Sequence, residues 1–91
     1  MVKYKVEWSI EARLDLLDIL EYYYQRNGNV NYSRKLNSKI NKSIQHITKN
    51  PTIGLQTDID TVKALVNGDY QIIYEIIKTT ILCNQFYKAV P

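Results

Sequence analysis

The first residues of the chain alternate between apolar and charged side chains. From Val2 to Trp8 every second residue is apolar, and the residues between are Lys3, Lys5 and Glu7. A period of two is typical of a strand with one buried face. We therefore predict a strand over these residues.

After Ser9 the apolar period lengthens to that of a helix. Ser9 occupies an N-cap position, and the carboxylate of Glu11 in the first turn is favourable to the helix dipole. The predicted helix ends at Asn27-Gly28, because glycine readily adopts the left-handed conformation that closes a helix. It carries two neighbouring apolar stripes. One consists of Ile10, Leu14, Leu17, Leu20 and Tyr24, and the other of Ala12, Leu16, Ile19 and Tyr23.

A second amphipathic helix is predicted from about Asn31 to Lys49, with Asn50-Pro51 ending it. At about 100° per residue its basic side chains gather in a stripe about 80° wide, away from the apolar face. The apolar face consists of Leu36, Ile40, Ile44 and Ile47. The basic stripe consists of Lys35, Lys39, Lys42, His46 and Lys49. The short connection between the two helices favours an antiparallel helical hairpin.

The last third of the chain has the pattern of a β-meander. A loop over Pro51 to Asp60 precedes three strands, which are predicted over about Thr61 to Val66, Tyr70 to Ile77 and Ile81 to Tyr87. Asn67-Gly68 predicts a two-residue hairpin turn, and Lys78 to Thr80 a second turn. The whole pattern is β-α-α-β-β-β. It predicts an α+β fold in a single domain over residues 1–91, with an antiparallel sheet and the helical hairpin packed on one face.

Composition and charge narrow the class of protein. The net charge is only +3, but five of the nine acids lie between Glu7 and Glu21, and no acid occurs between Tyr22 and Thr57. Such segregation favours a polyanion or an acidic protein as partner. Cys83 is the only cysteine, which excludes an internal disulfide and suits a reducing cytosol. Neither a signal peptide nor a membrane-spanning segment is recognisable, so a cytoplasmic location is expected.

The sequence offers few residues for catalysis or metal binding. A single histidine and a single cysteine, far apart in the chain, do not predict a zinc site. No glycine-rich phosphate loop and no serine or cysteine triad is suggested. We therefore expect neither a metal nor a cofactor, and any acid–base catalysis would depend on other groups.

The order of elements and three motifs resemble the RelE/ParE toxin superfamily. The first motif is Ala12-x-x-Asp15-Leu16-x-x-Ile19-x-x-Tyr22, and the second is Asn50-Pro51-x-x-Gly54 after the second helix. The third, Val62-Lys63-x-Leu65-x-x-x-x-Tyr70-x-Ile72-x-Tyr74-x-Ile76, is similar to the family's "R-x-L … Y-x-I-x-Y-x-I" segment. The resemblance covers nearly the whole chain. Lysine stands at Lys63 and Lys88, where relatives usually carry arginine, and it lacks the planar fork that grips phosphate with two hydrogen bonds.

This resemblance implies the toxin of a bacterial type II toxin–antitoxin pair. Relatives similar to RelE cleave messenger RNA on the ribosome, whereas relatives similar to ParE poison DNA gyrase and need no nuclease site. A nuclease would place its site at Lys63, Tyr87 and Lys88, although each of these is also interpretable as a surface side chain. The sparse catalytic set favours the gyrase-directed type or a weakened nuclease. The alternative is a degenerate, non-toxic binding module that keeps only antitoxin or nucleic-acid binding.

The resemblance also implies a cognate antitoxin that covers the toxin, and a homodimer is a further possibility. Tyr22 is a candidate contact for a partner, although the simpler interpretation is that Tyr23 and Tyr24 are core residues and Tyr22 is merely at the surface. Four lysines of the second helix are candidates for contact with phosphate or with an acidic antitoxin segment, namely Lys35, Lys39, Lys42 and Lys49. The simpler interpretation of the same stripe is a solvated helix face.

Overall fold

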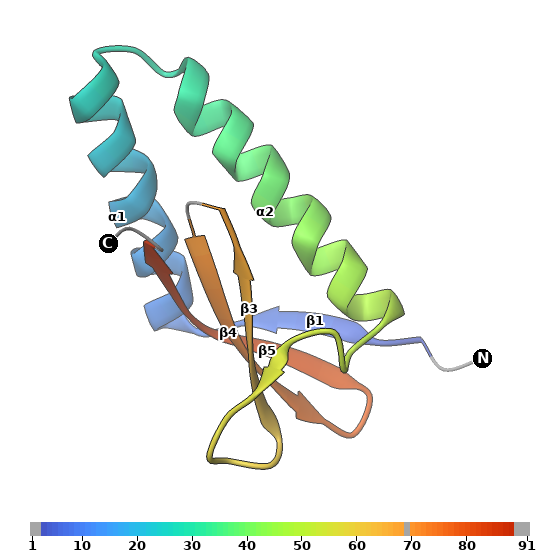
Figure 1. Ribbon diagram of the computed structural model, residues 1–91. Coiled ribbons are helices and arrows are strands. Elements are labelled where there is room, and N and C mark those ends of the chain that lie inside the picture. The colour runs from blue at the N-terminus through green and yellow to red at the C-terminus, as the bar shows by residue number, and fades with distance from the viewer. Residues whose placement is uncertain (1–2, 69, 89–91) are drawn as a thin grey trace.

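The computed structural model describes residues 3–68 and 70–88 and contains two helices and five strands (Figure 1). The elements in chain order are β1 (Lys5–Trp8), α1 (Ile10–Asn27), α2 (Asn31–Lys49), β2 (Leu55–Gln56), β3 (Val62–Asn67), β4 (Tyr70–Ile77) and β5 (Thr80–Lys88). The predicted α+β order of elements is confirmed. Residues 1 and 2, with which the first strand was predicted to begin, lie outside the described residues.

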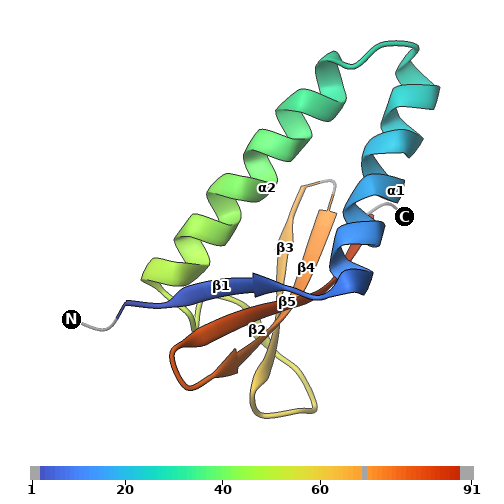
Figure 2. The same cartoon turned by 180° about the vertical axis from the view of Figure 1, so that it is seen from behind.

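The strands form one sheet in the order β1-β5-β4-β3-β2. β3, β4 and β5 pair antiparallel, but β1 runs parallel to β5, as the two adjacent arrows in Figure 2 show. The sheet is therefore mixed, and the prediction of a purely antiparallel sheet is wrong at this pair. A tight hairpin forces antiparallel pairing, whereas β1 reaches β5 only through the helices and three further strands, so no turn fixes its direction.

A short strand also forms inside the predicted loop. β2 pairs antiparallel with β3, with Leu55 opposite Ala64. The buried Tyr74 hydroxyl holds the loop in place, because it donates to the Pro51 carbonyl at 2.7 Å and accepts from the Gly54 N–H at 3.0 Å. A side chain at Gly54 would place its Cβ 2.7 Å from that oxygen, so the loop can close over Tyr74 only with glycine there.

The turn between β3 and β4 lies one residue later than predicted. Asn67 still pairs with Tyr70, so β3 runs through Asn67 and the turn begins at Gly68, which has a φ of 62°. The reason is tertiary, because the Asn67 amide is engaged by side chains of β4 and α2. Asp69, the next residue, lies outside the described residues.

The start of α1 is joined to β5 by side-chain hydrogen bonds. Ser9 caps the helix as predicted, with its Oγ accepting from the Ala12 N–H at 2.9 Å, and it also donates to the Asn84 carbonyl at 2.7 Å. One turn further on, an Asp15 carboxylate oxygen accepts from the Phe86 N–H at 3.1 Å. These contacts fix which face of α1 meets the sheet.

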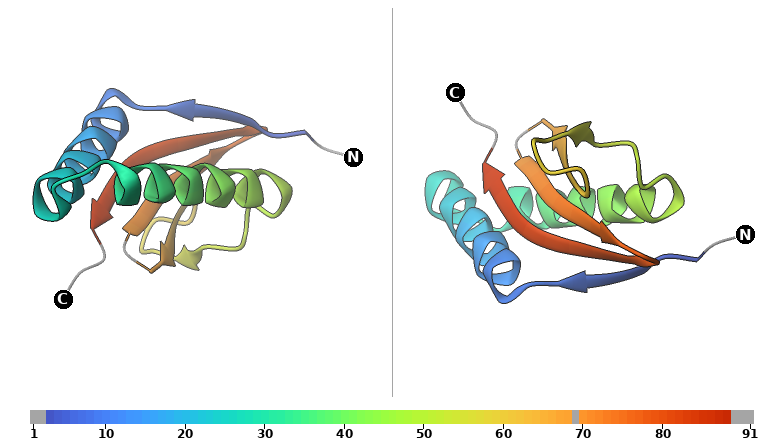
Figure 3. Two further views of the ribbon diagram at one scale, coloured as in Figure 1. Left: turned by 90° about the horizontal axis from the view of Figure 1, so that it is seen from above. Right: turned by 90° about the horizontal axis from the view of Figure 1, so that it is seen from below.

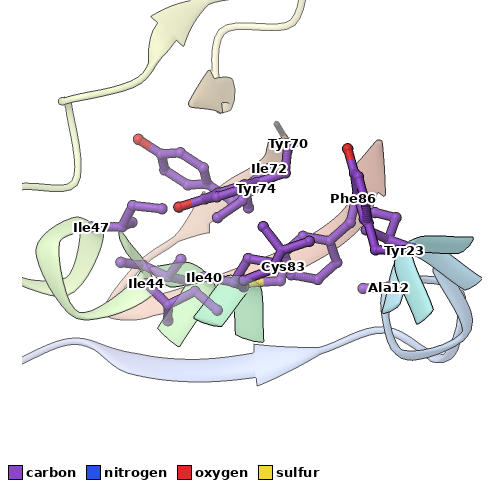
Figure 4. Close-up of a cluster of buried hydrophobic side chains, with 13 residues drawn as sticks. Ala12, Tyr23, Ile40, Ile44, Ile47, Tyr70, Ile72, Tyr74, Cys83 and Phe86 are labelled. Carbon is purple, nitrogen blue, oxygen red and sulfur yellow. The ribbon is translucent and has the colours of Figure 1, made fainter. Parts of the chain in front are cut away.

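The helices cover the core on one side of the curved sheet. Figure 3 shows α2 lying across the sheet, with β1 on one side of it and β2 and β3 on the other. The predicted apolar face of α2 is buried, and Ser43 is buried with it. Figure 4 shows the α2 isoleucines gathered against sheet residues. The sheet contributes the buried side chains Tyr70, Ile72, Tyr74, Ile81, Cys83 and Phe86. Burial raises the pKa of the Cys83 thiol from 9.0 to about 11, which keeps it protonated at neutral pH.

Truncating the core side of α2 tests this packing. Ile40 is fully buried, with 0% of its surface exposed, so Ile40→Ala is expected to lower the free energy of unfolding by about 2–5 kcal/mol. Urea denaturation followed by circular dichroism measures the change. Ile59 is 61% exposed, and the matched variant Ile59→Ala is expected to change the free energy by about 0.5 kcal/mol or less. Equal losses in both variants would contradict the assignment of the core.

Candidate functional site

The two lysines suggested for a nuclease site lie far apart on the sheet. Lys63 pairs with Tyr74 and Lys88 pairs with Tyr70, on either side of β4. Their partners on β4 are four residues apart, which separates the two lysines by about 13 Å along the strand direction. Because β4 lies between β3 and β5, the two lysines are also about 10 Å apart across the sheet. Each has its own local partner. The Lys63 ammonium donates to Gln56 Oε1 at 2.6 Å, and the Lys88 ammonium lies 3.5 Å from the centre of the Tyr22 ring.

Tyr87, the third member of the suggested set, belongs to the opposite face of the sheet. It pairs with Gln71, whereas its neighbours Phe86 and Lys88 pair with residues whose side chains face the helices. Successive side chains of a strand point to opposite faces, so Tyr87 points away from the face that carries Lys63 and Lys88. Its hydroxyl donates to Gln85 Oε1 at 2.6 Å. The structure therefore does not bring the three residues together, and their catalytic role remains a prediction.

The three consecutive tyrosines of α1 are distributed differently from the expected arrangement, in which Tyr23 and Tyr24 are core and Tyr22 is at the surface. Tyr23 is buried, as predicted, but Tyr24 is 42% exposed. Tyr22 is half-buried, because its ring packs edge-on against Tyr23 and is covered by the Lys88 ammonium. Tyr22 therefore offers a partner only part of its ring and its hydroxyl, which accepts from Arg26 at 3.2 Å.

Four exposed apolar side chains lie together on the side of α1 that turns away from the core. We call it the outer face of α1 and define it by Ile10, Leu14, Leu17 and Tyr24. These side chains are 78%, 55%, 62% and 42% exposed in that order. At about 100° per residue they lie within an arc of about 80°, nearly opposite the buried residues of the helix. Of the first predicted stripe, only Leu20 packs against the core.

A pocket of about 470 Å³ opens beside the outer face of α1. It is lined by Trp8 at the end of β1 and by Arg13, Leu16 and Leu17 of the helix. The Trp8 ring forms its rigid side, because it packs against Phe86 with ring centres 5.0 Å apart. An apolar surface with an adjoining pocket and one cationic side chain is suited to a protein segment with apolar anchors.

The lysines of the α2 stripe are all exposed, on the side of the helix away from its buried face. A second pocket, of about 280 Å³, separates part of this stripe from the β3–β4 turn. The residues that form its inner wall were not recognised from the sequence. They are Ser43, Asn67 and Tyr70, which lie up to 27 residues apart and are joined by hydrogen bonds. Only the tertiary fold brings them together.

Neither helix in the described part of the chain has the length and apolar character needed to cross a membrane. Within residues 3–68 and 70–88, no group of three His, Cys, Asp or Glu side chains is arranged as metal ligands.

Solved structures of toxins share this fold along their whole length. The chromosomal ParDE system from P. aeruginosa matches with a TM-score of 0.76 at 13% identity, covering 97% of this chain and 98% of that one. The RelBE2 toxin–antitoxin complex from Mycobacterium tuberculosis matches with a TM-score of 0.69 at 20% identity, covering 96% and 99%. The YoeB dimer from Staphylococcus aureus matches with a TM-score of 0.64 at 17% identity, covering 99% and 100%. These likenesses define the chain as a protein of the RelE/ParE toxin fold.

The amino-acid sequence assigns the chain to one family within this fold. The family described as ParE toxin of type II toxin-antitoxin system, parDE, matches residues 6–83. The chain therefore belongs to the ParE toxin family. A sequence comparison with curated proteins gives no match.

Proposed function

We propose that this chain is the toxin of a type II toxin–antitoxin pair, that it arrests growth by acting on DNA gyrase, and that a co-encoded antitoxin neutralises it by covering α1. The observation that carries the proposal is the outer face of α1, where three large aliphatic side chains are each more than half exposed. Exposing them to water is unfavourable, and a partner that buries them gains apolar contact area.

An antitoxin segment is the occupant that best fits this surface. The ParDE and RelBE2 structures with the same fold are described as a toxin–antitoxin system and a toxin–antitoxin complex. An amphipathic helix would set apolar residues against Leu14 and Leu17 and place one anchor in the pocket beside Trp8. An acidic residue at its edge would meet Arg13 in that pocket. A second copy of this chain is the other occupant to test, since the related S. aureus YoeB is described as a dimer.

Two observations support gyrase over messenger RNA as the target. The family match is to ParE toxins, and relatives similar to ParE act on gyrase. In addition, Lys63, Tyr87 and Lys88 are divided between distant positions and two faces of the sheet, whereas a nuclease needs its groups within reach of one phosphate.

A supercoiling assay tests the target. Purified protein added to gyrase, ATP and relaxed plasmid is expected to inhibit supercoiling in proportion to its concentration, and an equimolar amount of antitoxin is expected to restore activity. The folded variant Lys63→Ala with Lys88→Ala is expected to inhibit as well as the wild type, because neither lysine serves a nuclease site in this mechanism.

Primer extension on messenger RNA from induced cells provides the opposing result. Uninhibited gyrase together with new cleavage sites in messenger RNA, lost in the double lysine variant, would overturn the gyrase assignment in favour of a nuclease. Such a result would also restore the catalytic role predicted for these lysines.

A further inference from the structure

We propose that the pocket between α2 and the β3–β4 turn binds a backbone phosphate of a nucleic acid strand, and that the strand continues along the lysine stripe of α2. This site lies on a different surface from the outer face of α1. It does not depend on the identity of the toxin's target.

The pocket combines positive charge with a fixed wall. Lys39, Lys42 and His46 line it from the exposed side of α2, and Asn67 and Gly68 line it from the turn. No acidic side chain of the described residues is among the lining. Within the described part of the chain, the ammonium groups of Lys39 and Lys42 form no ion pair.

A buried polar network links the two sides of the pocket. The Tyr70 hydroxyl donates to the Lys39 carbonyl at 3.2 Å and shares a 2.5 Å hydrogen bond with Ser43 Oγ. The Asn67 amide group donates to both of these oxygens, at 3.1 Å to Tyr70 and 3.3 Å to Ser43. Tyr70 is only 1% exposed and Ser43 5%. The hydroxyls are thus satisfied inside the protein. Their role is to position the turn and the helix, while the lysines bind the anion.

The arrangement of charge favours a regular polyanion over a protein segment. Lys35, Lys39, Lys42, His46 and Lys49 recur at alternating spacings of four and three residues, which spreads them over about 21 Å of helix at about 5 Å intervals. Protein segments are usually anchored by apolar side chains. Leu36 is the only aliphatic side chain among the described residues that line the pocket, and it is 1% exposed. A chain of phosphates needs no such anchor, and contacts of this kind carry no sequence preference.

Fluorescence anisotropy with the full-length protein tests the site. The probes are a labelled single-stranded RNA, a labelled DNA duplex and a labelled oligoglutamate peptide, each titrated at several salt concentrations. We expect the wild type to bind at least one of the nucleic acids. Comparison of the RNA and DNA titrations shows which of the two it prefers. Binding to oligoglutamate more tightly than to either nucleic acid would overturn the proposal in favour of an acidic protein segment.

Removing charge from the pocket distinguishes this site from the overall charge of the protein. Lys39→Gln with Lys42→Gln is expected to weaken binding about tenfold and to reduce the salt slope by about 1.4 for a single strand or about 1.8 for a duplex. The matched variant Lys3→Gln with Lys5→Gln removes the same charge from the region of β1 and is expected to bind nearly as the wild type does. Equal losses in the two variants would overturn the proposal.

Tyr70→Phe tests the fixed wall without changing any charge. We expect weaker binding with an unchanged salt slope, because the turn is released from α2 while the number of neutralised phosphates stays the same. Circular dichroism establishes that the variant is folded. Unchanged affinity in the folded variant would show that only helix charge acts, and would overturn the assignment of a formed pocket.

Discussion

Replacing Leu14 and Leu17 with aspartate is expected to weaken antitoxin binding at least a hundredfold while the free protein folds normally. Both side chains are more than half exposed, so the unbound protein loses little packing. Burying one leucine contributes about 1.5–3 kcal/mol, and about 1.4 kcal/mol corresponds to a tenfold change in the dissociation constant. Because 55% and 62% of these two side chains remain to be buried, they together account for about 1.8–3.5 kcal/mol, a factor of about 20 to 300. The introduced carboxylates add a desolvation cost, which raises the expected loss above a hundredfold.

Isothermal titration calorimetry with the co-encoded antitoxin measures this effect. A matched control is Leu55→Asp with Ile59→Asp, which introduces the same charge at side chains that are 67% and 61% exposed near β2. The control is expected to bind the antitoxin as the wild type does. If the two double variants bound equally well, the outer face of α1 would not be the antitoxin site.

Light scattering on the same samples shows whether the antitoxin or a second copy of the chain occupies the outer face of α1. The unbound wild type is expected to have the mass of a monomer. A stable dimer that dissociates in the Leu14→Asp, Leu17→Asp variant would instead assign the outer face of α1 to self-association.

Both helices were predicted with their observed bounds, because the signals at their ends are local. Ser9 needs only the first turn of α1 to form a cap, and Gly28 closes the helix through its own backbone, with a φ of 72°. The core face of α2 was likewise predictable, since its apolar residues form a single stripe. Local chemistry of this kind can be interpreted without knowledge of the rest of the fold.

Features that depend on partners distant in sequence were not predictable. β2 has only two residues, both exposed, and exists through its pairing with β3. The parallel direction of β1 depends on its pairing with β5, which lies near the other end of the chain. The turn after β3 follows Asn67, whose amide is held by Tyr70 and Ser43.

The candidate sites also depend on contacts between residues that are distant in the sequence. Two apolar stripes were recognised on α1, but which of them is buried depends on how Ser9 and Asp15 attach the helix to β5. The position of Tyr87 relative to Lys63 depends on strand register, which shifts between Ile73 and Tyr74. The basic stripe of α2 was recognised, whereas the pocket beside it requires a turn that lies more than twenty residues away in the chain.

The proposed growth arrest should give the largest effect of all, because a toxin acts on a target that each cell needs. Inducing the chain from a tightly repressed promoter is expected to reduce colony counts by orders of magnitude, and co-expressing the antitoxin is expected to restore them. The Leu14→Asp, Leu17→Asp variant offers a matched comparison. It is expected to remain toxic even with the antitoxin present, because it no longer binds the antitoxin.

Colony formation after induction, with the amount of soluble protein measured in parallel, is the most direct test that this chain inhibits growth. We predict a collapse in colony counts that the antitoxin reverses. Normal colony counts in cells that accumulate the folded, soluble wild-type protein would contradict the account, and would identify the chain as a binding module that has kept the toxin fold without its activity.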